Sequence, residues 1–274
     1  MALSRPNTVI FTDIDGTLID LANYSFKTSA PAIAQLMKNK VPVVLCSSKT
    51  FSEQLFYRRI LEIPDPFIVE NGSAVFIPCG YFPFDIAFQA ERDGYLVVEL
   101  GEKTKMIYRT LCRIRSRTGI SFHTYQDMNI EEIADITGLS IEAAIRATQR
   151  DYSQTIISSV SPDVLKRLQK ALAEEKLTAL CGGRFLTITS QASHKGAAVS
   201  LLATHFRRKL GEVITVGIGD SPNDRTLLEA VDRPFLVQQP NGKWHPMEDI
   251  DVIRVPAPGP EGWCHMAEQF LPAA

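Results

Sequence analysis

The stretch Val9–Leu18 reads VIFTDIDGTL, an apolar, β-branched run that ends in two aspartates two residues apart and a Gly-Thr pair. Such a run predicts a buried strand, and because strand side chains alternate between faces, we expect Asp13 and Asp15 to leave it on the same side. Gly16 allows a sharp turn. Two carboxylates this close repel each other unless a cation lies between them, and a hard divalent ion, most plausibly magnesium, is the natural partner. A carboxylate can also be a nucleophile, so the stretch indicates a phosphoryl-transfer centre.

The alternative interpretation of this stretch is a turn that carries two solvated acids, and the rest of the chain bears on the choice. Residues Val41–Cys46 (VPVVLC) read as a second buried strand, and Ser47 follows it. The hydroxyl of Ser47 and nearby backbone N–H groups could bind a phosphate oxygen, with Ser48 as the second candidate. Thr50, followed by Glu53, is the capping box of the next helix.

A lysine begins the predicted helix Lys195–Leu210 (KGAAVSLLATHFRRKL). A cation at a helix N-terminus opposes the helix dipole, so the position is unfavourable without a compensating anion. Lys195 is therefore the candidate cation beside the phosphoryl group, and a solvated surface lysine is the alternative.

The segment Gly217–Asp224 (GIGDSPND) ends another predicted strand. Asp220 lies at the strand end and is a candidate metal ligand. Asp224 lies one helical turn further, where an acid is also favoured as part of a helix cap. We therefore expect Asp224 to support the residues that bind the metal, or to contact the metal through a water molecule. In open α/β sheets ligands bind at the carboxyl ends of strands, which is where all these segments lie.

Composition bounds the class of protein. The chain has 274 residues, 45% hydrophobic and 22% charged, with a net charge of −2. No basic field indicates nucleic acid or an anionic membrane as partner, and no apolar run approaches the roughly 18–20 residues that span a bilayer. The five cysteines form no CxxC pair and the N-terminus has no signal-peptide pattern, so we expect a cytoplasmic protein with reduced thiols. The sequence leaves open a monomer or a homodimer.

Strand and helix patterns alternate in the first and last thirds of the chain, which predicts an α/β fold with a parallel sheet. The middle third alternates less regularly and predicts an α+β insert. We therefore expect a Rossmann-like core from residues 1–85 and 190–274, and an inserted cap domain from residues 86–189.

The run DIDGTL resembles the D-x-D-G-T-[LV] signature of the haloacid dehalogenase-like (HAD) superfamily, and KGAAV and GIGDSPND resemble its later motifs. The resemblance implies a Mg²⁺-dependent phosphatase with a type IIB cap. It implies Asp13 as nucleophile and Asp15 as general acid/base, with Ser47 and Lys195 holding the phosphoryl group. The implied metal ligands are Asp13, Asp15, Asp220 and Asp224.

Longer segments resemble the mannosyl-3-phosphoglycerate phosphatase family, namely VPVVLCSSKT, PFIVENGSAVFIP, FHTYQDMNIEEIADITGL, RDYSQ, CGGRF and APGPEGW. This resemblance implies a hexosyl-3-phosphoglycerate substrate, which is a small phosphorylated sugar acid, and a glycosyl glycerate product of the compatible-solute type. Asp151 and Gln154 depart from the family run, which leaves the hexose, mannose or glucose, open.

A glycerate carboxylate calls for a planar cation, for which Arg184 and then Arg150 are candidates. Glu70, Asn71 and Asp127 are candidates for sugar hydroxyls. Each has a structural alternative: Arg184 packing on a strand, residues 70–72 forming a turn, and Asp127 preceding a helix. A broader sugar-phosphate phosphatase or a phosphomutase is the rival function, and a non-catalytic binding module is the rival from another class.

Overall fold

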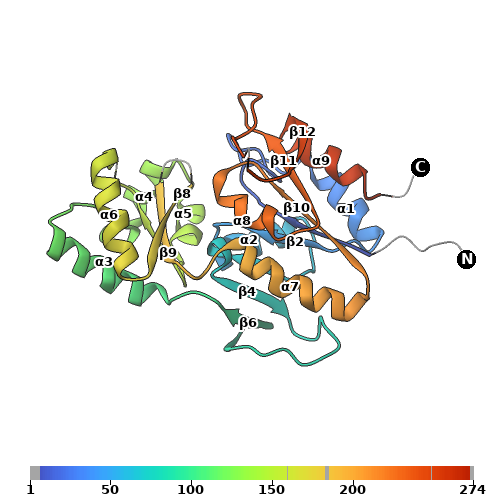
Figure 1. The fold of residues 1–274 in the computed structure, drawn as a ribbon, viewed down its shortest axis with the longest axis horizontal. Helices are drawn as coiled ribbons and strands as arrows, with labels where there is room; N and C mark the ends of the chain where they lie inside the picture. Colours follow the sequence, from blue (N-terminus) through green and yellow to red (C-terminus); the bar gives the residue numbers. More distant parts are fainter. Residues whose placement is uncertain (1–6, 159, 183–184, 248, 272–274) are drawn as a thin grey trace, which may run out of the picture.

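The computed structural model describes residues 7–158, 160–182, 185–247 and 249–271, and in it the chain forms two lobes (Figure 1). The larger lobe contains a nine-stranded sheet and the smaller lobe a three-stranded one. The larger sheet has the spatial order β12 (Ile253–Pro258), β11 (Arg233–Gln238), β10 (Val213–Gly219), β1 (Asn7–Thr12), β2 (Val43–Cys46), β3 (Phe67–Val69), β4 (Ala74–Pro78), β6 (Tyr95–Glu99) and β5 (Ala90–Arg92).

The sheet is parallel from β12 to β3, which confirms the predicted α/β fold with a parallel sheet. Beyond β3 it becomes antiparallel, because no crossover α-helix lies between β3, β4, β5 and β6 along the chain. Residues 86–99, which the sequence analysis assigned to the insert, thus lie in the large sheet. These residues were assigned to the insert because strands and helices do not alternate regularly there. That pattern is equally typical of the antiparallel edge of a sheet.

Helices cover both faces of the large sheet. On one face, α1 (Ala30–Lys38), α2 (Phe51–Ile60) and α9 (Glu261–Glu268) contribute side chains to the same core cluster as Ile10. On the other face, α7 (Lys195–Leu210) and α8 (Arg225–Glu229) pack with Val9 and Phe11. Strand β1 is therefore buried on both faces, as expected of a near-continuous apolar run in a parallel sheet.

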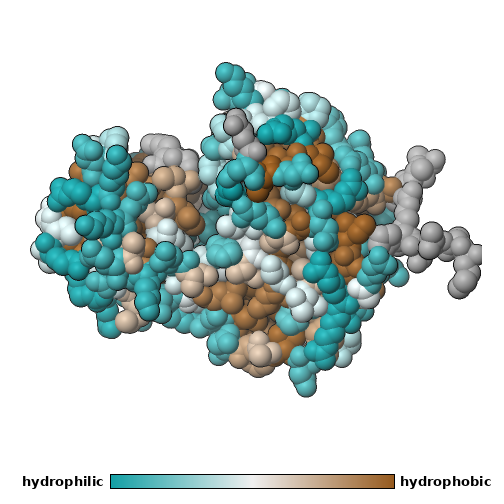
Figure 2. All heavy atoms as spheres, in the orientation of Figure 1, coloured by the Kyte–Doolittle hydropathy of each residue, from teal (hydrophilic) through white to brown (hydrophobic). Residues whose placement is uncertain are grey.

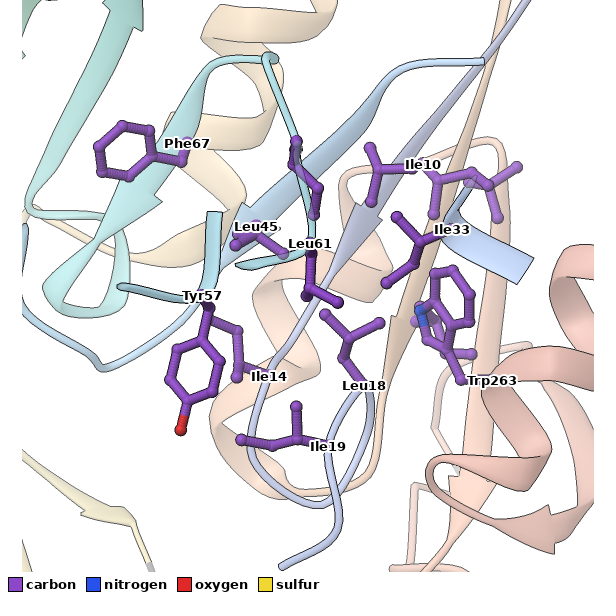
Figure 3. Close-up of a cluster of buried hydrophobic side chains, with 14 of the residues drawn as sticks. Ile10, Ile14, Leu18, Ile19, Ile33, Leu45, Tyr57, Leu61, Phe67 and Trp263 are labelled. Atoms are coloured by element: carbon purple, nitrogen blue, oxygen red, sulfur yellow. The ribbon is translucent and has the colours of Figure 1, made fainter. Parts of the chain in front are cut away.

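The loop after β1 is anchored by its apolar side chains. Ile14, Leu18 and Ile19 are all fully buried, and Figure 3 shows them among Ile33 and Leu61. Because Ile14 points into the core, the aspartates on either side of it are turned away from that core. The sequence alternation thereby sets the direction of both carboxylates at the carboxyl edge of the sheet.

The smaller lobe has its own hydrophobic clusters and is predominantly hydrophilic on the face seen in Figure 2. Its sheet has the order β7 (Gln154–Ile156), β9 (Phe185–Ser190) and β8 (Leu177–Gly182). Helices α3 (Thr104–Thr118) and α6 (Pro162–Glu174) pack on this sheet. Helix α5 (Ile141–Thr148) contacts α2, and α4 (Ile130–Thr137) packs against α5. Among the described residues, no helix combines the length and the apolar character needed to cross a membrane.

Candidate active site

A buried lysine joins two carboxylates from opposite ends of the chain. Lys195 Nζ lies 2.7 Å from Asp13 Oδ1 and 2.6 Å from Asp224 Oδ1, and all three side chains are buried. Burial opposes the positive charge, but Asp13 and Asp224 outweigh it and raise the pKa of Lys195 above its ordinary value. The anions that a lysine at a helix N-terminus requires are therefore present.

Asp13, Asp220 and Asp224 form an acidic cluster, with one oxygen of each within 4.8 Å of the others. Burial, followed by the charge of Asp224, raises the pKa of Asp13 to about 7. Burial, followed by the charges of Asp224 and Asp13, raises the pKa of Asp220 to about 8. One lysine does not balance three carboxylates in this space. The donor set, with hard oxygen ligands and excess negative charge, fits a divalent metal ion.

The oxygens of Asp224 are already occupied by protein donors. Its Oδ1 accepts from Lys195, and its Oδ2 accepts from the backbone N–H groups of Asp220 and Ser221, both at 3.1 Å. Ser221 and Asp224 also form the capping box of the short helix η3 (Pro222–Asp224). This geometry favours the expectation that Asp224 does not bind the metal ion directly, and that it instead holds Lys195 and the loop that carries Asp220.

The structure places the Asp15 carboxylate outside the cluster of Asp13, Asp220 and Asp224, and its role as a metal ligand stays a prediction. Asp15 Oδ1 forms an ion pair with Lys49 Nζ at 2.9 Å. The cation beside the second aspartate is therefore a lysine, which the sequence analysis missed. The signal was available, because Lys49 directly precedes the N-cap Thr50 of α2, where a positive charge opposes the helix dipole as it does at Lys195.

Ser47 and Ser48 lie directly after β2, at the same edge of the sheet as Asp13, since Leu45 of β2 pairs with Thr12 of β1. Ser47 is buried, its Oγ accepts from Lys49 N–H at 3.4 Å, and its carbonyl accepts from Asn71 N–H. The carbonyl of Ser48 faces the smaller lobe and accepts from a guanidinium of that lobe. Both residues lie where the sequence placed them, and their roles stay predictions.

Glu70 is not available to sugar hydroxyls, contrary to its prediction. It lies in the short helix η1 (Glu70–Gly72), is fully buried, and accepts hydrogen bonds from Asp151 N–H at 2.8 Å, Tyr152 N–H at 3.1 Å and the Ser153 hydroxyl. Burial raises the pKa of Glu70, and the hydrogen bonds from these donors offset only part of that effect. Glu70 therefore fastens the smaller lobe to the large sheet, which corresponds to the structural alternative for residues 70–72.

The neighbouring Asn71 is also buried, in a left-handed conformation with φ 60°. Its side-chain Oδ1 is buried without a hydrogen-bond partner among the described residues. The turn is held in place at Gly72, where an added Cβ would lie 2.2 Å from the carbonyl oxygen of His194. Asn71 is thus fixed close to the start of α7, and a role toward substrate stays a prediction for it.

The other predicted substrate residues divide into three groups. Arg150 lies where the lobes meet, and its Nη1 donates to the Ser48 carbonyl at 3.3 Å and to Ser153 Oγ at 2.7 Å. Asp127 is a cap residue of η2 (Tyr125–Asp127) that forms an ion pair with Arg115, so the structural alternative describes it. Arg184 lies outside the described residues.

Gln154, one of the two departures from the family run, is buried. Its side-chain Nε2 donates to the hydroxyl of Thr104 at 2.6 Å. Asp151, the other departure, forms an ion pair with Arg92 of β5. Both residues therefore join segments of the protein to each other.

Comparison with known proteins identifies relatives over most of the chain. Residues 10–243 match the haloacid dehalogenase-like hydrolase family. A glucosyl-3-phosphoglycerate/mannosyl-3-phosphoglycerate phosphatase from Methanococcoides burtonii is 36% identical over 256 residues, which cover 93% of this chain and 94% of that protein. A mannosyl-3-phosphoglycerate phosphatase from Pyrococcus horikoshii is 37% identical over 229 residues, 84% of this chain and 90% of the relative.

Solved structures show the same fold at lower identity. A phosphatase of the HAD superfamily from Bacteroides thetaiotaomicron superposes with a TM-score of 0.70 at 16% identity, over 98% of this chain and 97% of that one. A HAD subclass IIB sugar phosphatase superposes with a TM-score of 0.65 at 17% identity, over 96% and 99% of the two chains. These structures agree in their arrangement of elements with the two lobes described above.

Proposed function

Because the chain belongs to the haloacid dehalogenase-like hydrolase family, we propose that it is a phosphatase that hydrolyses a hexosyl-3-phosphoglycerate, with glucose or mannose as the hexose, to the glycosyl glycerate and phosphate. The observation that carries the proposal is the buried arrangement of Asp13, Lys195, Asp220 and Asp224 in a chain that is similar to such phosphatases over nine-tenths of its length.

In the first step, an oxygen of Asp13 attacks phosphorus in line with the leaving oxygen of the glycerate. The phosphorus–oxygen ester bond breaks, an aspartyl-phosphate forms, and Asp15 gives its proton to the leaving alkoxide. Lys195 lies 2.7 Å from the nucleophilic carboxylate and offsets negative charge as the phosphoryl group approaches.

In the second step, Asp15 takes a proton from water, whose oxygen attacks phosphorus. The bond between phosphorus and Asp13 breaks, which releases phosphate, regenerates the Asp13 carboxylate and leaves Asp15 protonated for the next cycle. Asp15 therefore acts as the general acid in the first step and as the general base in the second. The pairing of Asp15 with Lys49 keeps it apart from the acidic cluster, so the two aspartates of the same loop have separate partners.

We propose Mg²⁺ as the metal ion, held by the carboxylates of Asp13 and Asp220. Asp220 Oδ1 accepts from Thr17 Oγ1 at 3.2 Å, and an added Cβ on Gly16 would lie 3.0 Å from Asp220 Oδ2, so the loop after β1 fits closely around this acid. When bound, the ion would neutralise charge on the nucleophile and the phosphoryl oxygens. We further propose that the smaller lobe, residues 104–189, is the cap that selects the leaving group.

The proposal is tested by measuring phosphate release from glucosyl- and mannosyl-3-phosphoglycerate and from plain hexose phosphates, with and without Mg²⁺. We expect the hexosyl-3-phosphoglycerates to give the highest kcat/KM, and Asp13→Asn to abolish release from every ester. A preference for plain hexose phosphates would favour the broader sugar phosphatase. Isomerised sugar phosphate with little free phosphate would indicate the mutase.

A further inference from the structure

Lys49 is surrounded by acidic and aromatic side chains. Its ammonium group lies 2.9 Å from Asp15 and 3.7 Å from Glu53, and 5.5 Å from the ring centroids of both Tyr24 and Tyr57. The side chain is 9% exposed. Burial opposes its charge, but Asp15 and then Glu53 outweigh burial and raise the pKa of Lys49. The lysine is therefore a fixed positive charge at this place.

This charge lies where the smaller lobe closes on the large sheet. The hydroxyl of Thr50, the next residue, donates to the carbonyl of Arg146 at the end of α5, at 2.8 Å. Tyr125 of the smaller lobe is near enough for the charges of Arg150, Glu53 and Lys49 to act on its pKa, which burial raises. Lys49 and Asp15 therefore lie on the side of the large sheet that the smaller lobe contacts.

The chemistry of the ester places a negative charge on this side. Asp15 serves the leaving oxygen, and in a phosphoglycerate the carboxylate is separated from that oxygen by two carbon atoms, a span of roughly 4 Å. An ammonium group has three N–H donors, and the 3.7 Å separation from Glu53 exceeds an ordinary hydrogen bond. Asp15 therefore leaves donor capacity on Lys49 for a further anion.

Two other described cations near the site have protein partners of their own, although the Nε of Arg150 is buried without a hydrogen-bond partner among the described residues. Lys195 is held between Asp13 and Asp224 on the phosphoryl side. Arg150, which the sequence favoured for the carboxylate, directs one guanidinium nitrogen to the Ser48 carbonyl and Ser153 hydroxyl, and lies 3.8 Å from Glu70.

We propose that Lys49 is a specificity-determining residue that binds the carboxylate of the leaving glycerate, beside the aspartate that protonates the same leaving group. The inference rests on the proposed function and deepens it. It assigns the choice of an acidic leaving group to the core loop after β2, in addition to the smaller lobe.

The experiment compares esters that differ only in the carboxylate. The first pair is glucosyl-3-phosphoglycerate and the glucosylglycerol phosphate in which a hydroxymethyl group replaces the carboxylate; the second is 3-phosphoglycerate and glycerol 3-phosphate. For wild type we expect kcat/KM to favour the acid of each pair by about 10- to 100-fold, the range of one charge-assisted hydrogen bond. Lys49→Met should bring the ratio close to unity, and Lys49→Arg should retain most of it.

The ratio separates carboxylate binding from any disturbance of Asp15, which would lower kcat/KM for both members of a pair equally. Lys209→Met is the matched control, because Lys209 also lies over an aromatic ring, 3.9 Å from the Tyr81 centroid, but outside the acidic site. It should leave the ratio unchanged.

Three results would overturn the inference: an unchanged ratio in Lys49→Met, a ratio that vanishes in Arg150→Met instead, or a wild type without preference for the acid. The last of these needs no variant to fold. A wild type that prefers the acid in the second pair but does not act on hexosyl esters would refute the proposed function alone.

Discussion

The carboxylate of Glu70 gives the sharpest test of how the two lobes are joined. It is fully buried and accepts from two backbone N–H groups, of Asp151 and Tyr152, and from the Ser153 hydroxyl. A buried donor left without an acceptor costs about 1–3 kcal/mol, so three of them predict that Glu70→Ala loses at least about 3 kcal/mol of unfolding free energy. For a chain of this size, that corresponds to a melting temperature about 6–12 °C lower.

The assay is thermal unfolding together with amide hydrogen exchange in residues 150–153, which should exchange faster in Glu70→Ala. Asp65→Asn is the matched control, because Asp65 is likewise a buried acid that accepts from a backbone N–H, of Val43 at 2.8 Å, but lies within the larger lobe. It should lower the melting temperature without speeding exchange in that segment. Unchanged stability of Glu70→Ala, with a raised KM for sugar esters and normal hydrolysis of p-nitrophenyl phosphate, would refute this reasoning and restore the sugar-hydroxyl role.

Three further predictions concern the acidic site and the turn beside it. Asp224→Asn removes the negative charge that pairs with Lys195, and in steady-state assays it should lower kcat about 10²-fold or more with little change in KM. The pKa values of Asp13 and Asp220 are raised to about 7 and 8 from 3.8 in the unfolded chain, so the metal-free folded state binds protons more tightly than the unfolded state. The melting temperature of the metal-free protein should therefore fall as the pH rises from about 4 to 8. Mg²⁺ should raise the melting temperature more at pH 8 than at pH 5, and a Mg²⁺ effect independent of pH would contradict this reasoning. Gly72→Ala, with φ +94° and a backbone carbonyl 2.2 Å from the added Cβ, should fail to give folded protein, as judged by its circular dichroism and yield.

The catalytic edge of the sheet could be predicted because short-range patterns determine it. An apolar run, its length and the polar residue that ends it locate a strand end, and the carboxyl ends of parallel strands meet. Asp13 and Asp220 are brought together by the direct pairing of β1 with β10, although they are far apart in sequence. The same reasoning gave Lys195, whose unfavourable position at a helix start requires anions nearby.

The boundary of the insert and the role of Glu70 could not be predicted in this way. Strands β5 and β6 join the large sheet through antiparallel pairing with β4, and nothing in the local pattern of residues 86–99 distinguishes this partner from a strand of the smaller lobe. Glu70 is polar and lies in a turn, which is typical of a binding residue. Its donors come from residues 151–153, and only the packing of the two lobes against each other reveals that these donors satisfy the Glu70 carboxylate.

Lys49 shows where the sequence argument could have gone further. The repulsion between Asp13 and Asp15 was taken to require one metal ion between them, whereas the structure divides the negative charge between two lysines, Lys195 for the first aspartate and Lys49 for the second. Each lysine lies at the start of a helix, where the dipole disfavours it and a carboxylate compensates. The dipole argument applied to Lys195 therefore applies equally to Lys49. The two separate pairs give the nucleophile and the proton donor of one loop different neighbours.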